Sequence, residues 1–168
     1  MAEINLAHER EILSWADFGT ATRALASEIA EEGFRPDIVL AIARGGLPVA
    51  GAVGYALGLK NCFVINVEFY TGVDERLEMP VILPPALDVV DITGEQVLVV
   101  DDVADTGETL RLVVDTVHPA AAELRTLVLY HKPRSVVRPD YVWRDTDRWI
   151  TFPWSDRPPV TGQGVRDV

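Results

Sequence analysis

Two kinds of apolar pattern alternate along the chain. Compact apolar runs bounded by charged or turn-forming residues predict five strands, at 37–43, 61–68, 81–83, 97–100 and 124–130. In the runs at 37–43 and 97–100 the apolar positions are consecutive, as in strands that are covered on both faces. Because such strands are typical of parallel sheets, we expect an α/β fold with an open parallel sheet flanked by helices.

Segments in which apolar residues have helical spacing lie before or after several of these strands. Apolar residues three and four positions apart predict a helix that begins at Ser14 and ends at Gly33. Pro48 fits the first turn of a second helix, which runs to about Leu57 and ends at Gly58. Helices placed between strands in this way act as crossover connections and cover a parallel sheet.

Length and composition indicate one domain. A chain of 168 residues is long enough for one well-packed core and short for two. We expect a single domain over 1–168, with a core at about 14–131, a small C-terminal hood of short strands at about 132–156, and a tail rich in Pro, Gly and charged residues.

Net charge and apolar content indicate which binding partners and which cellular compartment to expect. The net charge of −11 argues against a nucleic-acid partner, because phosphate backbones are bound chiefly by clustered Lys and Arg. No apolar run approaches the ~18 residues of a membrane span, and no basic segment leads into an apolar one, so we expect a cytoplasmic protein with no membrane partner. The single cysteine, Cys62, lies in an apolar run and is predicted to be a core residue in a reducing compartment.

An acidic pair follows the apolar run at 97–100. Asp101 and Asp102 are predicted at the carboxyl edge of the sheet, where open α/β sheets bind ligands, and they suit a metal ion or sugar hydroxyls. The segment 104–109 that comes next is small, hydroxyl-bearing and acidic, and an apolar helical repeat follows it. A tight loop that opens a helix presents backbone N–H groups and the positive end of the helix dipole, which favours phosphate.

A second anion site is predicted at Arg44-Gly45-Gly46, which lies between the strand at 37–43 and the helix whose first turn contains Pro48. A glycine-rich turn before a helix presents backbone donors, and Arg44 can donate two hydrogen bonds to one anion.

These two motifs, in this order, resemble those of the type I phosphoribosyltransferases, which bind phosphoribosyl pyrophosphate (PRPP). The apolar strand, the acidic pair and Asp105-Thr106-Gly107 are similar to the PRPP signature, and Ala43-Arg44-Gly45-Gly46 is similar to the pyrophosphate loop, whose peptide before the arginine is often cis. The resemblance implies PRPP binding by Arg44, Gly45, Gly46, Asp101, Asp102, Ala104, Asp105, Thr106, Gly107, Glu108 and Thr109. It further implies that Asp101 and Asp102 hold Mg²⁺, directly or through water, and that Asp105 faces purine N7 as the catalytic base.

The C-terminal third resembles the 6-oxopurine enzymes of this family. Lys132-Pro133 after the strand at 124–130, and the aromatic run from Trp149 to Trp154, imply a base site. There Lys132 reads the purine O6, Trp149 stacks on the base, and the main chain of Ile150 contacts its edge. The aromatic run is also predicted to form a strand.

The segment 69–94 leaves two interpretations open. Its length and its prolines favour a lid that begins near Tyr70, Thr71 and Gly72 and closes over the site, as in the family. The alternative is a β-hairpin extension used in dimer contacts, with 81–83 as a short strand.

Together these features predict transfer of the 5-phosphoribosyl group from PRPP to a 6-oxopurine (hypoxanthine, guanine or xanthine), with Mg²⁺ and in a homodimer or homotetramer. Two alternatives remain at this point: a PRPP- or nucleotide-sensing regulator of the same fold without catalysis, and a phosphoribosyltransferase that uses another base.

Overall fold

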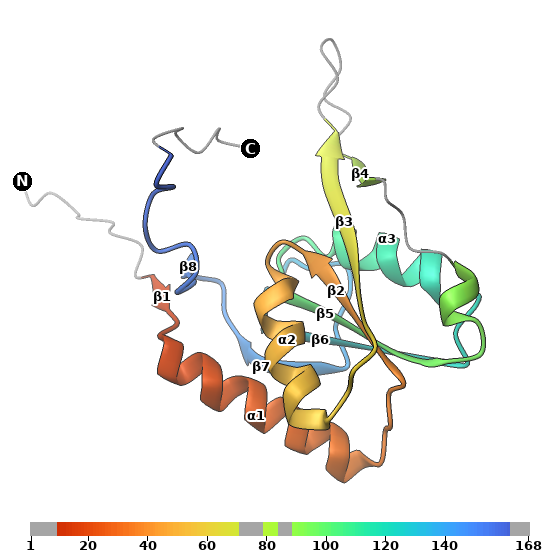
Figure 1. The fold of residues 1–168 in the computed structure, drawn as a ribbon. Helices are drawn as coiled ribbons and strands as arrows, with labels where there is room; N and C mark the ends of the chain where they lie inside the picture. Colours follow the sequence, from red (N-terminus) through yellow and green to blue (C-terminus); the bar gives the residue numbers. More distant parts are fainter. Residues whose placement is uncertain (1–9, 71–78, 84–88, 162–168) are drawn as a thin grey trace, which may run out of the picture.

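The computed structural model describes residues 10–70, 79–83 and 89–161, and its centre is a six-stranded sheet (Figure 1). The strands lie in the order β4-β3-β2-β5-β6-β7. The described elements, in chain order, are β1 (Glu11–Ile12), α1 (Trp15–Glu32), β2 (Ile38–Ala43), α2 (Gly46–Leu57), β3 (Cys62–Tyr70), β4 (Met79–Leu83), the 3₁₀-helix η1 (Val89–Ile92), β5 (Gln96–Ala104), α3 (Glu108–Val117), β6 (Glu123–His131), β7 (Tyr141–Asp145) and β8 (Ile150–Thr151).

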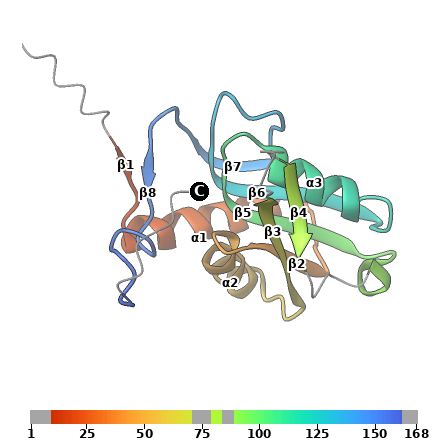
Figure 2. The same ribbon diagram turned by 90° about the horizontal axis from the view of Figure 1, so that it is seen from above.

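The sheet confirms the predicted fold class. Strands β3, β2, β5, β6 and β7 are parallel, and β4 joins the edge antiparallel to β3. Helices α1 and α2 lie on one face and α3 on the other (Figures 1 and 2). Within the described residues, no helix combines the length and apolar character needed to cross a membrane.

Both faces of the central strands are buried, as the consecutive apolar runs predict. In β5, Leu98 and Val100 belong to the core on the α1 and α2 side, whereas Val97 and Val99 belong to the core around α3. Because side chains alternate along a strand, one apolar run supplies two cores. The fold therefore buries β5 completely from Val97 to Val100, where its acidic residues begin.

Local capping sets the helix ends. The Ser14 hydroxyl accepts a hydrogen bond from the Asp17 N–H (3.1 Å), and Gly33 ends α1 with φ 84°. Helix α2 begins at Gly46, so Pro48 lies in its first turn as predicted, and it ends at Gly58 in the same left-handed conformation. The Arg44-Gly45 turn thus leads straight into the helix.

A second, two-stranded sheet joins the two ends of the described chain. Strand β1 pairs in parallel with β8, and the Glu11 N–H donates to the Trp149 carbonyl (2.9 Å). The predicted strand over the aromatic run is too long, because only residues 150–151 form a strand. Pro153 has no backbone N–H to donate to a neighbouring strand. Within 132–156, β7 extends the central sheet, so this region contributes to both sheets.

The prediction that Cys62 is a core residue is wrong, since its side chain is exposed. Cys62 shares one face of β3 with Val64, Asn66 and Glu68, which are all exposed, whereas Phe63, Ile65 and Val67 on the other face pack in the core around α3. An apolar run therefore does not guarantee that both faces of its strand are buried.

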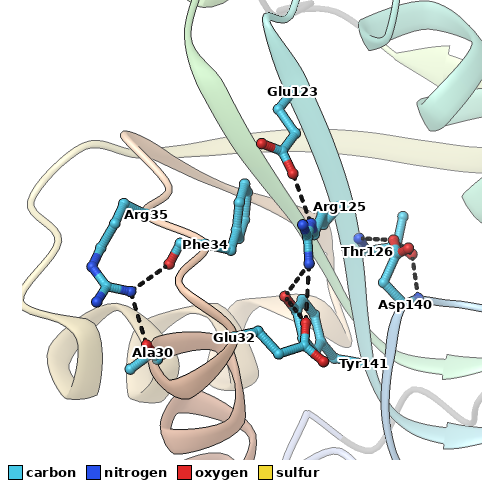
Figure 3. A network of polar contacts seen from close by, with 9 residues as sticks. All are labelled: Ala30, Glu32, Phe34, Arg35, Glu123, Arg125, Thr126, Asp140 and Tyr141. Carbon is cyan, nitrogen blue, oxygen red and sulfur yellow. Dashed lines mark hydrogen bonds and ion pairs between the residues drawn. The ribbon is translucent and has the colours of Figure 1, made fainter.

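A polar network fastens β7 to the body of the domain (Figure 3). The Arg125 guanidinium on β6 donates to Glu32 on α1 (3.0 Å) and to the Tyr141 hydroxyl on β7 (2.9 Å). Asp140 accepts hydrogen bonds from the backbone and the hydroxyl of Thr126 (2.7 and 2.8 Å). These contacts set the position of the chain that continues into the predicted base site.

Candidate active site

The acidic pair lies within β5 rather than after its end. The ladder between β5 and β6 continues past the pair, with Asp101 opposite Val128 and Ala104 opposite His131. The prediction that the strand stops at the acids is therefore wrong, because pairing with β6 does not depend on the polarity of the side chains. As neighbours on a strand, Asp101 and Asp102 have side chains that leave opposite faces of the sheet.

Each acid lines a different cavity. Asp101 and the loop from Val103 to Gly107 line a cavity of about 190 Å³. Asp102 lines a cavity of about 850 Å³ with Arg44, Gly45 and the tail from Trp154 to Val160. The strand thus separates a small pocket beside α3 from a larger one beside α2.

The Arg44 turn lies against the acidic strand. A Cβ at Gly45 would collide with the Asp102 carboxylate, and a Cβ at Gly46 would collide with the Val100 carbonyl oxygen. The peptide between Ala43 and Arg44 is cis, as the family resemblance implies. Both glycines are needed because backbone and carboxylate approach more closely than any side chain allows.

The environment of the two acids raises the pKa of each. Burial, together with the neighbouring Asp102 carboxylate, raises the pKa of Asp101 well above its usual range. Burial also raises the pKa of Asp102 to about 6. A cation in contact with these oxygens would lower both pKa values, because it stabilises the ionised carboxylates.

Two carboxylates with hard oxygen donors suit Mg²⁺, which is commonly held by one or two protein carboxylates plus substrate phosphates and water. Among residues 10–70, 79–83 and 89–161 there is no group of three or more His, Cys, Asp or Glu side chains that could hold a metal ion alone. The donor set at Asp101 and Asp102 therefore fits a magnesium ion that arrives with a phosphorylated substrate.

The predicted phosphate loop ends at the start of α3. Gly107 precedes the helix with φ 79°, a conformation that other residues rarely adopt. A Cβ there would also strike the Ser135 hydroxyl and crowd the backbone nitrogen of Val136 (3.0 Å). The loop is thus packed between its own helix and the segment after β6. The Glu108 carboxylate pairs with Arg111 (2.7 Å) one turn along α3.

Asp105 lies between two cationic side chains. Arg134 Nε and Nη2 donate to Asp105 Oδ1 (2.9 and 2.5 Å), and Nη2 also contacts Oδ2 (2.5 Å). The Lys132 ammonium is 4.0 Å from Oδ1. The predicted catalytic base and the predicted base-reading lysine therefore lie together, although they come from different loops.

Lys132 also connects this cluster to the aromatic run. Its side chain is only 10% exposed, and Nζ donates to the Arg148 carbonyl (2.7 Å). The next residue, Trp149, is 65% exposed, and Ile150 packs partly against the core. The structure thus brings Lys132 to the residue before Trp149. Stacking of Trp149 on a base and contact by the Ile150 main chain remain predictions.

The predicted lid falls partly outside the described residues, which include Tyr70 at the end of β3 but neither Thr71 nor Gly72. The described part of 69–94 contains β4, which pairs antiparallel with β3 through partners such as Tyr70 and Met79. This pairing agrees with the short strand of the alternative interpretation, whereas its use in dimer contacts remains a prediction.

Two features of the site were not predicted from the sequence. Arg134 contacts Asp105 across 29 positions of sequence, and no local pattern signals that pairing. The tail residue Arg157 lines the same cavity as Arg44 and Asp102. Asp156 lines it too, and its closeness in sequence to the aromatic run is the feature of the tail that points toward the site.

Comparison with known proteins agrees with this geometry. The phosphoribosyl transferase domain model matches residues 8–157. A xanthine-guanine phosphoribosyltransferase from Ruegeria sp. (strain TM1040) is 34% identical, covering 89% of this chain and 88% of the relative. Another from Idiomarina loihiensis is 30% identical over 84% of each chain. The crystal structure of a purine phosphoribosyltransferase from Pyrococcus horikoshii Ot3 is 38% identical with a TM-score of 0.78, covering 90% of this chain and 97% of that one. The chain therefore belongs to the phosphoribosyl transferase domain family.

Proposed function

We propose that the protein transfers the 5-phosphoribosyl group from PRPP to a 6-oxopurine and releases pyrophosphate, a purine salvage reaction. The names of its relatives and the family match support this activity. The observation that carries the choice of base is the position of the Lys132 ammonium 4.0 Å from the Asp105 carboxylate.

The Asp105 and Lys132 pair suits one edge of an oxopurine. That edge presents the O6 acceptor beside the ring nitrogen N7. An ammonium donates to O6, and a carboxylate accepts from N7 when that nitrogen carries the proton. Adenine presents an amino group in place of O6. That amino group is a hydrogen-bond donor, so it cannot accept a hydrogen bond from the Lys132 ammonium.

Different residues of the chain act on the base, the ribose and the two phosphate groups during the reaction. The base N9 forms a bond to C1′ of the ribose while the C1′–O bond to pyrophosphate breaks and the pyrophosphate leaves with the electron pair. The Asp105 carboxylate accepts the proton from N7 and becomes a carboxylic acid. The Arg44 turn holds the departing pyrophosphate, and the 104–109 backbone holds the 5′-phosphate.

Asp101 and Asp102 would orient the ribose hydroxyls and hold Mg²⁺ at the boundary between the two cavities. When bound, the ion neutralises charge on the pyrophosphate. We further propose that the protein acts as a cytoplasmic homodimer or homotetramer, as the family resemblance implies.

A PRPP-dependent assay of pyrophosphate release against hypoxanthine, guanine, xanthine, adenine and a pyrimidine tests this function. Nucleotide formation from PRPP, Mg²⁺ and an oxopurine is expected. Binding of PRPP without turnover of any base would instead identify a sensing protein, and turnover of adenine or a pyrimidine alone would overturn the choice of base.

Replacing Lys132 with alanine is expected to reduce the preference for oxopurines. We expect the ratio of kcat/KM for hypoxanthine to that for adenine to fall at least about tenfold, because one charged hydrogen bond to O6 is lost. A ratio from one preparation does not depend on how much of the protein is folded. Lys60→Ala, which removes the exposed lysine before β3, is the control and is expected to leave the ratio unchanged. An unchanged ratio in Lys132→Ala would refute the role of Lys132.

A further inference from the structure

The contact between Arg134 and Asp105 uses most of the carboxylate's capacity for hydrogen bonds. An ionised carboxylate has about four lone-pair positions. Three donor contacts come from Arg134, at 2.9 Å to Oδ1 from Nε and at 2.5 Å to each oxygen from Nη2. The remaining capacity is about one hydrogen bond, which matches the single N–H that a purine base would present.

The backbones that carry these two side chains are joined on both sides of the contact. The Lys132 N–H donates to the Ala104 carbonyl (3.0 Å), and the Val136 N–H donates to the Thr106 carbonyl (2.8 Å). Arg134 lies between the two donors and Asp105 lies between the two acceptors. The orientation of the carboxylate is therefore set by the fold and by the planar guanidinium together.

Folding stability gives little reason for this pair. Arg134 is 63% exposed, and ion pairs between exposed side chains contribute little to the free energy of unfolding. The same segment carries a second pair of similar exposure, in which Arg138, 64% exposed, contacts Asp145 at 2.9 Å. Only the first of these pairs involves a residue of the predicted reaction centre.

We propose that Arg134 is a positioning residue for phosphoribosyl transfer. It holds the Asp105 carboxylate in the orientation that accepts the proton from the purine base. This inference rests on the proposed function. It assigns Arg134 no contact with the reacting atoms, so its effect on the reaction passes through Asp105.

The experiment compares Arg134→Gln with Arg138→Gln in the full chain. For Arg134→Gln we expect kcat to fall about 10- to 100-fold, because a misplaced reacting group costs this much, while the KM for PRPP stays within about twofold. The Tm is expected to change by no more than about 3 °C in either variant. Arg138→Gln is expected to keep its turnover. Arg134→Lys retains the charge but not the two-point contact, and its kcat is expected between those of Arg134→Gln and the unmodified protein.

A double-mutant cycle tests the route through Asp105. In the Asp105→Asn background, Arg134→Gln is expected to lower kcat less than twofold, because the group that it positions has lost its function. Three results would overturn the proposal. Arg134→Gln lowers kcat equally in both backgrounds, it has the same turnover as Arg138→Gln, or it raises the KM for PRPP as much as it lowers kcat. If the unmodified protein turns over no base, the proposed function fails and this inference fails with it. An active protein indifferent to Arg134 refutes the inference alone.

Discussion

Asp105→Asn is expected to lower kcat at least about 100-fold, while the affinity for PRPP changes by less than about threefold. The amide has nearly the shape of the carboxylate but cannot accept a proton from the purine base. The Asp105 carboxylate lies between Arg134 and Lys132, so both cationic side chains act on it. Steady-state kinetics at saturating PRPP and base, with calorimetric titration of PRPP, would measure the two quantities separately.

Asp115→Asn is the matched control for that measurement. It removes the same charge from an exposed position on α3, outside the phosphate loop. Its turnover and PRPP affinity are expected to match those of the unmodified protein. If Asp105→Asn retains full turnover, Asp105 is not the base. If turnover and PRPP affinity fall together, the change has disturbed the loop rather than a proton transfer.

Gly46→Ala is expected to give the largest loss of stability. Its Cβ would collide with the Val100 carbonyl oxygen and approach the Asp101 Cα to 3.2 Å, so backbone must move on both sides of the contact. We expect the free energy of unfolding to fall by about 3 kcal/mol, since neither β5 nor the start of α2 can shift without disturbing the core. For a domain of this size that corresponds to a Tm lower by about 6–12 °C in thermal unfolding.

Gly51→Ala provides the comparison on the same helix. No heavy atom lies within 4 Å of the Cβ position at Gly51, which is exposed on α2. Alanine there is expected to raise the free energy of unfolding by about 0.5–1 kcal/mol, because it reduces the freedom of the unfolded chain. Equal stabilities for the two variants would show that the close approach between Gly46 and β5 does not constrain the fold.

Residues near one another in the chain account for what could be predicted. Ser14 and Gly33 bound α1, and Gly58 ends α2, because capping depends on a few neighbouring residues. The apolar runs of β2 and β5 predicted strands buried on both faces, and the structure confirms them. The order of the two anion motifs indicated the family for the same reason, since each motif is a continuous stretch.

Errors arose where a distant strand determines the outcome. The extension of β5 through its two acids depends on pairing with β6, and the exposure of Cys62 depends on which face of β3 the rest of the fold covers. The pairing of Glu11 with the hood joins residues at opposite ends of the chain. No window of neighbouring residues contains these partners.

The sequence by itself determined the class of fold, most helix ends and the two motifs that indicate the family, because these follow from local backbone preferences, apolar spacing and continuous stretches of sequence. Only the tertiary structure decided that Asp101 and Asp102 line different cavities and that Arg134 contacts Asp105. The physical reason is that strand register and sheet order direct each side chain, and both are set by partners far along the chain.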